Sequence, residues 1–92
     1  METAQTYTGP IHLRPIEQET VDAICERVAS AANCNFYVIS EMRGFKRDRT
    51  PWDAQRLANV LALYDIAPEL VRDLDKLAED RAGLVPLNRN AD

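Results

Sequence analysis

The 92 residues of the chain suffice for one domain with one modest hydrophobic core. Hydrophobic residues make up 46% and charged residues 28%, a globular composition that excludes disorder and collagen-like repetition. No apolar run approaches the roughly 20 residues that a transmembrane helix needs, so no membrane partner is expected. The N-terminus lacks the basic start and apolar stretch of a secretory signal, which predicts a cytoplasmic protein.

The net charge of −4 is distributed unevenly. Residues 1–39 hold five acidic and two basic side chains, and residues 57–92 hold seven acidic and four basic ones. Residues 40–56 instead hold five basic and three acidic side chains. The positive charge is therefore concentrated in one short stretch of an otherwise acidic chain, and this stretch is the informative one.

The chain is predicted to begin with a flexible arm at residues 1–10, followed by a single domain over 11–83. Residues 11–16 alternate apolar and polar side chains, which suits a short strand or an extended lead-in. From Glu17 to about Ala32, apolar residues recur at steps of three and four and predict a helix. Asn33 is expected to end this helix, because asparagine tolerates the left-handed conformation.

Residues 36–42 admit two interpretations. Asn35 can cap a helix that begins at Phe36, whereas the aromatic and β-branched residues at 36–39 favour a strand. The helical interpretation predicts a mainly α fold, a small helix-turn-helix bundle of four to five helices. The alternative is a small α+β domain with strands near 11–16 and 36–42.

Residues 44–50 are predicted to form a basic loop, followed by a helix to about Tyr64. Thr50 is suited to cap that helix, Pro51 to occupy its first position and Asp53 to complete a capping box. Trp52 and Tyr64 are expected among its buried residues.

The last predicted helix begins at Pro68 and ends at Gly83. Leucines and other apolar residues recur along it at helical spacing, with charged residues on the opposite face. Residues 84–92 are expected to form a loosely held tail.

Catalytic chemistry is not predicted. A single histidine, His12, provides neither a catalytic triad nor, with Cys25 and Cys34, the spacing of a metal site. The three glycines form no phosphate-binding loop. In a reducing cytosol both cysteines are expected to be buried small hydrophobes. The sequence thus predicts a non-enzymatic protein without metal or cofactor that works by binding.

Residues 25–43 carry the pattern of a helix-turn-helix unit. Ala29 is the small residue expected where two helices cross closely. Asn33 is the turn residue, and Cys34 follows it as a small apolar plug. Ile39 and Met42 are the apolar residues that would hold the second helix against the first.

The pattern resembles the phage-repressor-like (Xre/Cro-type) helix-turn-helix family over roughly residues 17–78. The resemblance is carried by Val28-Ala29, Asn33-Cys34-Asn35, Ile39-Ser40, and a basic stretch that ends in Thr50-Pro51. It implies a five-helix domain whose second motif helix enters the major groove, often as a homodimer on a palindromic operator. The implied function is sequence-specific regulation of transcription, as a repressor bound to double-stranded DNA.

The resemblance also implies two sets of DNA contacts. Residues on the second motif helix would reach base edges, since asparagine suits adenine and arginine suits guanine. These residues are Asn35, Phe36, Tyr37, Ser40 and Arg43. Basic residues farther along would contact phosphates, which adds affinity and salt dependence. These are Lys46, Arg47 and Arg49.

The alternative function is that of a small protein-binding regulator: an antitoxin-like, phage-encoded or adaptor module that docks through acidic helical faces. Residues 36–42 bear on this choice, because a strand there would remove the recognition helix on which DNA binding depends.

Overall fold

A computed structural model describes residues 15–87, and every regular element in this range is a helix. The helices are α1 (Gln18–Ala32), α2 (Phe36–Asp48), α3 (Pro51–Leu63) and α4 (Pro68–Ala82). The predicted mainly α fold is confirmed, and the α+β alternative is wrong at 36–42, which belong to α2. The predicted arm at 1–10, the segment 11–14 and the end of the predicted tail at 88–92 lie outside the described residues.

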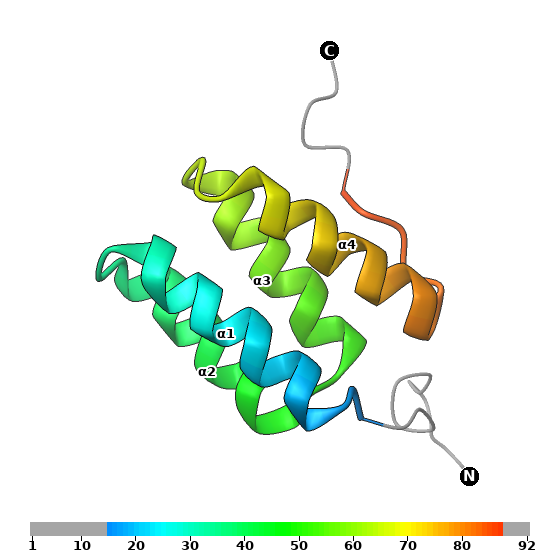
Figure 1. Cartoon of the computed structure of the whole chain (residues 1–92). Coiled ribbons are helices and arrows are strands. Elements are labelled where there is room, and N and C mark those ends of the chain that lie inside the picture. The colour runs from blue at the N-terminus through cyan, green and yellow to red at the C-terminus, as the bar shows by residue number, and fades with distance from the viewer. Residues whose placement is uncertain (1–14, 88–92) are drawn as a thin grey trace, which may run out of the picture.

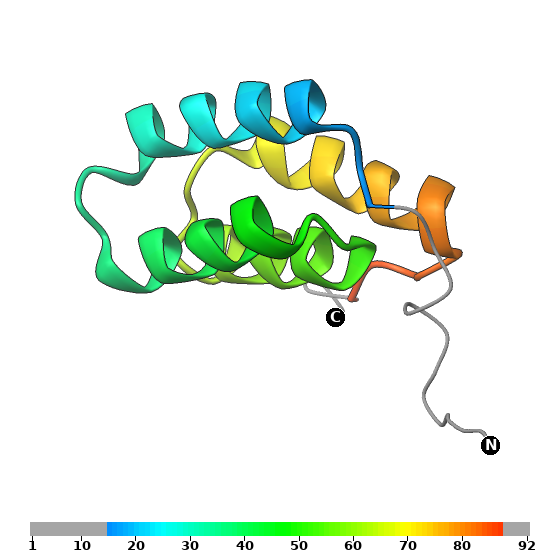
Figure 2. The same ribbon diagram turned by 90° about the horizontal axis from the view of Figure 1, so that it is seen from below.

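The four helices run alternately in opposite directions and form a bundle (Figure 1). Seen from below, α1 and α4 form one layer, while α2 and α3 form the other (Figure 2). The turns between α1 and α2 and between α3 and α4 therefore lie at the same end of the bundle (Figures 1 and 2). Among the helices of residues 15–87, none combines the length and apolar character that crossing a membrane requires.

The pair α1 and α2 is an antiparallel hairpin whose connection spans residues 33–35 (Figure 1). A helix-turn-helix unit instead crosses its two helices at about 90–120°. The hairpin differs from that arrangement, and it leaves the outward face of α2 as the part of this helix open to a partner. Ile39 and Met42 pack partly buried against the core, as expected, whereas Ala29 is exposed and Ala32 is buried in its place.

Helix boundaries follow the capping residues of the sequence. Asn33 ends α1 with a left-handed φ of 50°, and Gly83 ends α4 with a φ of 69°. The Asn35 side chain caps α2. Thr50 caps α3: its Oγ1 accepts the Asp53 N–H at 3.1 Å and donates to Asp53 Oδ2 at 2.7 Å. These four predicted signals are confirmed.

The predicted basic loop at 44–50 is wrong, because α2 continues through Gly44 to Asp48. A glycine inside a helix costs about 1 kcal/mol relative to alanine. The next residue, Phe45, is completely buried, and burying so large a side chain outweighs that cost. The helix ends at Arg49, which has a left-handed φ of 55°.

The core is contributed by all four helices and by Ile16, which precedes α1. Two hydrogen bonds join Ile16 to Arg49. The Ile16 N–H donates to the Arg49 carbonyl at 2.8 Å, and Arg49 Nη1 donates to the Ile16 carbonyl at 3.2 Å. Cys25 is buried as expected, whereas the burial expected for Cys34 is wrong, because Cys34 is exposed. The burial predicted for Trp52 and Tyr64 is also wrong, since 48% and 40% of their surfaces are exposed. At the start of α3, the buried residue is Pro51.

A candidate nucleic-acid interface on α2

The outward face of α2 carries a basic cluster. Val38 and Phe45 point into the core. Residues three or four positions apart share one side of a helix, so 36, 40, 43 and 47 form a line along the opposite side. The side chains of Ser40, Arg43 and Arg47 on this line are exposed, as is Lys46 beside them. We call these four residues the basic face of α2.

The cations of the basic face differ in their neighbours. Arg43 and Lys46 form no ion pair or side-chain hydrogen bond within the described residues. Arg47 donates to both oxygens of Asp48, with Nε–Oδ1 at 3.0 Å and Nη2–Oδ2 at 3.1 Å. This contact raises the pKa of Arg47 and lowers that of Asp48. Both groups are solvent-exposed, so an anionic ligand can compete for Arg47.

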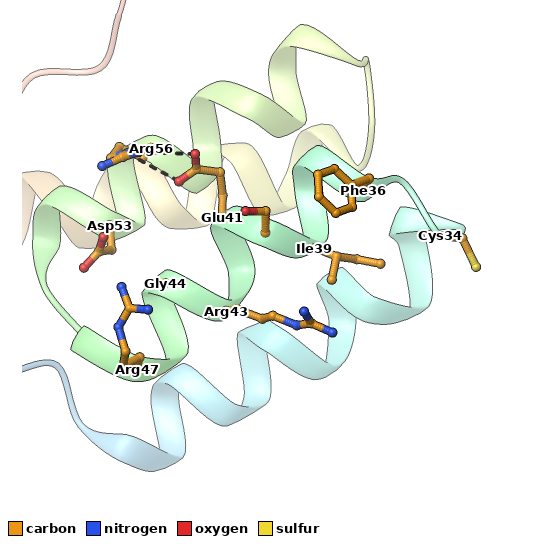
Figure 3. Close-up of a pocket in the computed structure, with 10 residues that line it drawn as sticks. Cys34, Phe36, Ile39, Glu41, Arg43, Gly44, Arg47, Asp53 and Arg56 are labelled. Carbon is orange, nitrogen blue, oxygen red and sulfur yellow. Dashed lines mark hydrogen bonds and ion pairs between the residues drawn. The ribbon is translucent and has the colours of Figure 1, made fainter.

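Glu41 lies next to the basic face, and an ion pair offsets its negative charge. Arg56 of α3 holds the Glu41 carboxylate with Nε–Oε1 at 3.3 Å (Figure 3). Helices α2 and α3 meet at this ion pair. One turn farther along α2, Gly44 faces Asp53 of α3, and a Cβ added to Gly44 would lie 3.9 Å from Asp53 Oδ1. Asp48 and Asp53 lie close to Arg47, whereas Arg43 and Lys46 have no acidic partner within the described residues.

A shallow groove of about 580 Å³ follows this surface (Figure 3). Its walls come mainly from α2, including Phe36, Ile39 and Arg43, and α3 contributes Asp53 and Arg56. Phe36 is the aromatic residue of the lining, and Arg43, Arg47 and Arg56 line the groove together with Glu41 and Asp53. The groove is open and would bury only a small part of the surface of a small molecule, so it suits an extended anionic ligand better.

The structure separates the predicted site residues into three groups. Ser40, Arg43, Lys46 and Arg47 come together on the basic face. Asn35 and Arg49 form a second group, which has structural partners: Asn35 Oδ1 accepts the N–H groups of Tyr37 at 3.0 Å and of Val38 at 3.1 Å. Arg49 is half-buried and donates to Ile16. Asn35 and Arg49 therefore act first as a helix cap and as a tether for the segment before α1.

The aromatic residues among the predicted base readers form a separate cluster. The ring of Tyr37 stacks on that of Tyr64 at a centroid distance of 6.0 Å and an interplanar angle of 9°. Phe36 meets Tyr37 edge-on at 5.7 Å. Sequence reasoning missed this cluster because Tyr64 was expected in the core and lies on another helix, far along the chain.

Most other cations of the described chain are paired. Arg27 contacts Asp73 at 3.2 Å, Lys76 contacts Asp80 at 3.6 Å, and Arg81 contacts Glu17 at 2.8 Å. Arg72 also lacks an ion pair within residues 15–87, but α4 is predominantly acidic around it. The basic face is thus the place where unneutralised positive charge gathers in this part of the chain.

Comparison of the chain with known protein families, with curated proteins and with solved structures gave no match. Within residues 15–87, no group of three histidine, cysteine or acidic side chains is placed to hold a metal ion.

Proposed function

We propose that the protein binds double-stranded DNA through the basic face of α2 and regulates transcription as a repressor-like protein. The observation that carries this proposal is the gathering of Arg43, Lys46 and Arg47 on one exposed helix face of an acidic chain. A helix of 13 residues is about 20 Å long, which is enough to follow several phosphates.

The roles within the face follow from its chemistry. Lys46 and Arg47 supply phosphate contacts, which position a protein on DNA without reading sequence. Arg43 is the residue best suited to read a base, because its guanidinium can donate two parallel hydrogen bonds to guanine. Ser40, one turn before Arg43, can donate to or accept from a base or a phosphate. The acidic remainder of the surface keeps non-specific binding weak.

Salt dependence gives the size of the effect. The logarithm of the binding constant for duplex DNA falls with that of the salt concentration with a slope of about −0.9 per phosphate contact. The two phosphate contacts of Lys46 and Arg47 predict a loss of about 12-fold between 50 and 200 mM salt, and one contact predicts a loss of about fourfold.

The test measures fluorescence anisotropy of a labelled pool of random-sequence duplexes at these two salt concentrations. Replacing both Arg43 and Lys46 by alanine should flatten the salt dependence to that of one contact. The matched control removes the same charge from α4, through Arg72→Ala and Lys76→Ala. The proposal fails if duplex DNA does not bind at low salt, or if the α4 control weakens binding as much as the α2 variant.

A second candidate is a protein-binding regulator, such as an antitoxin-like or adaptor module. It is favoured by α4, whose outward surface exposes Glu69, Asp73, Glu79 and Asp80. Such a face suits a basic protein partner. A stable stoichiometric protein complex that Glu69→Lys with Glu79→Lys disrupts, together with no duplex binding at low salt, would favour this candidate over the first.

A further inference from the structure

Phe36 is an exposed aromatic residue at one end of the groove along α2 (Figure 3). It is the first residue of the helix, and 73% of its surface is exposed. Within the described residues, its ring contacts that of Tyr37 at a centroid distance of 5.7 Å and an interplanar angle of 77°. Tyr37 is itself stacked on Tyr64, whereas no ring of residues 15–87 is stacked on Phe36. Phe36 therefore has a ring face available for a flat partner.

The side of α2 that carries Phe36 also carries cations of the groove. Positions 36, 40, 43 and 47 lie along one line of the helix, which is about 16 Å long at 1.5 Å per residue. The Arg43 side chain extends along α2 toward Ile39 and the end that carries Phe36 (Figure 3). Arg47 follows Arg43 at about 6 Å along the helix axis, a step close to that between neighbouring phosphates of one strand. The groove thus presents one flat apolar group followed by two guanidinium groups.

Charge and shape together indicate the ligand. Arg43 has no acidic partner within the described residues, and the contact of Arg47 with Asp48 is solvent-exposed, so an anion can bind both arginines. A nucleic-acid strand is a polyanion that carries flat apolar groups at regular intervals. In a duplex, neighbouring base pairs cover both faces of each base, and a protein reaches the base edges. In a single strand, a base can instead stack on an aromatic side chain, so the exposed ring of Phe36 fits an unpaired base.

We propose that the groove along α2 binds single-stranded nucleic acid, with an unpaired base stacked on Phe36 and the adjoining phosphates held by Arg43 and Arg47. This inference shares the basic face with the proposed function and goes beyond it, because it adds a ligand class and a contact that a duplex does not provide. Arg43 can serve both ligands, since a guanidinium donates two parallel hydrogen bonds to a phosphate as well as to guanine.

The test is fluorescence anisotropy of the full chain with labelled strands of about ten nucleotides that form no base pairs, one of deoxyuridine and one of uridine. The two strands differ in the 2′-hydroxyl, so their relative affinity distinguishes DNA from RNA as the source of the ligand. Phe36→Leu keeps an apolar side chain but removes the flat ring, and it should weaken single-strand binding by at least about fivefold. Phe36→Tyr restores a ring and should bind like the wild type. Because Phe36 is exposed, both variants should fold, which circular dichroism checks.

Arg43→Ala should also weaken single-strand binding. The matched control is Arg72→Ala, which removes an exposed arginine from α4 and should leave it unchanged. The inference is overturned if neither strand binds at low salt, or if Phe36→Leu binds a strand as the wild type does.

Titration of the same variants with a random-sequence duplex separates this inference from the proposed function. Phe36→Leu should leave duplex binding unchanged, because paired bases are not accessible to the ring. An equal loss of duplex and single-strand binding in this variant would overturn the inference. Duplex binding without single-strand binding would overturn the inference and leave the proposed function standing. Single-strand binding that depends on Phe36, without duplex binding, would support the inference and overturn the proposed function.

Discussion

Asn35 was predicted to contact a base, and the structure gives its side chain a different partner. Its Oδ1 accepts the N–H groups of Tyr37 at 3.0 Å and of Val38 at 3.1 Å. Asn35→Ala removes the acceptor of both groups, and losing an N-cap costs about 0.5–2 kcal/mol. Because Val38 is completely buried, water replaces its lost partner poorly, so we expect about 1–2 kcal/mol. For a domain of this size, that corresponds to a fall in Tm of about 5–15 °C.

Urea unfolding followed by far-UV circular dichroism measures this loss. Ser40→Ala is the control, because Ser40 is exposed on the same helix and should change the free energy of unfolding by less than about 0.5 kcal/mol. Asn35→Asp keeps an acceptor and places a negative charge at the helix start, so its stability should match the wild type. An Asn35→Ala variant as stable as Ser40→Ala would refute the capping role.

Three further results are expected. Phe45→Ala should lower the free energy of unfolding by about 3–5 kcal/mol, because the ring is completely buried; a loss below about 1 kcal/mol in the same urea assay would contradict the packing of α2. A thiol reagent should modify exposed Cys34 rapidly and buried Cys25 only on unfolding. Equal modification rates for the two cysteines would show that Cys25 is not protected by burial. Burial raises the pKa of Cys25, so its thiol deprotonates at lower pH in the unfolded chain than in the folded one. The free energy of unfolding should therefore fall as the pH rises above the ordinary thiol pKa. Asp48→Asn should free Arg47 and tighten duplex binding at low salt, and unchanged anisotropy titrations would show that Arg47 contacts no phosphate.

Capping signals predicted the helix ends because they are local. Asn33, Asn35, Thr50 and Gly83 each act within a few residues of their own position, through a left-handed φ or a side-chain hydrogen bond. The few residues around each of these positions were therefore sufficient to predict where a helix begins or ends. For the same reason, the cap at Asn35 gave the correct answer for α2, where strand propensity at 36–39 pointed the other way.

Features that depend on packing could not be predicted in the same way. Gly44 indicated a break, but the burial of Phe45 keeps α2 continuous. Arg49 was grouped with the phosphate contacts, and its partnership with Ile16 joins residues 33 positions apart. No local pattern reports such a contact.

The cluster of Phe36, Tyr37 and Tyr64 shows the same limit for the candidate site. Tyr64 has the helical spacing of a core residue, yet it lies at the C-terminal end of α3 and stacks outside on Tyr37. The basic residues were predicted as a group because they are close in sequence, but their position on one side of α2 was not predicted, because residues 44–50 were expected to form a loop and instead continue the helix to Asp48.

The central claim is that the basic face of α2 binds duplex DNA, and backbone amide chemical shifts during titration with a short duplex test it most directly. We predict that the largest changes fall on residues 40–47, that Arg43→Ala reduces them, and that α4 changes little. An absence of shift changes at low salt, or changes concentrated on α4, would contradict the claim.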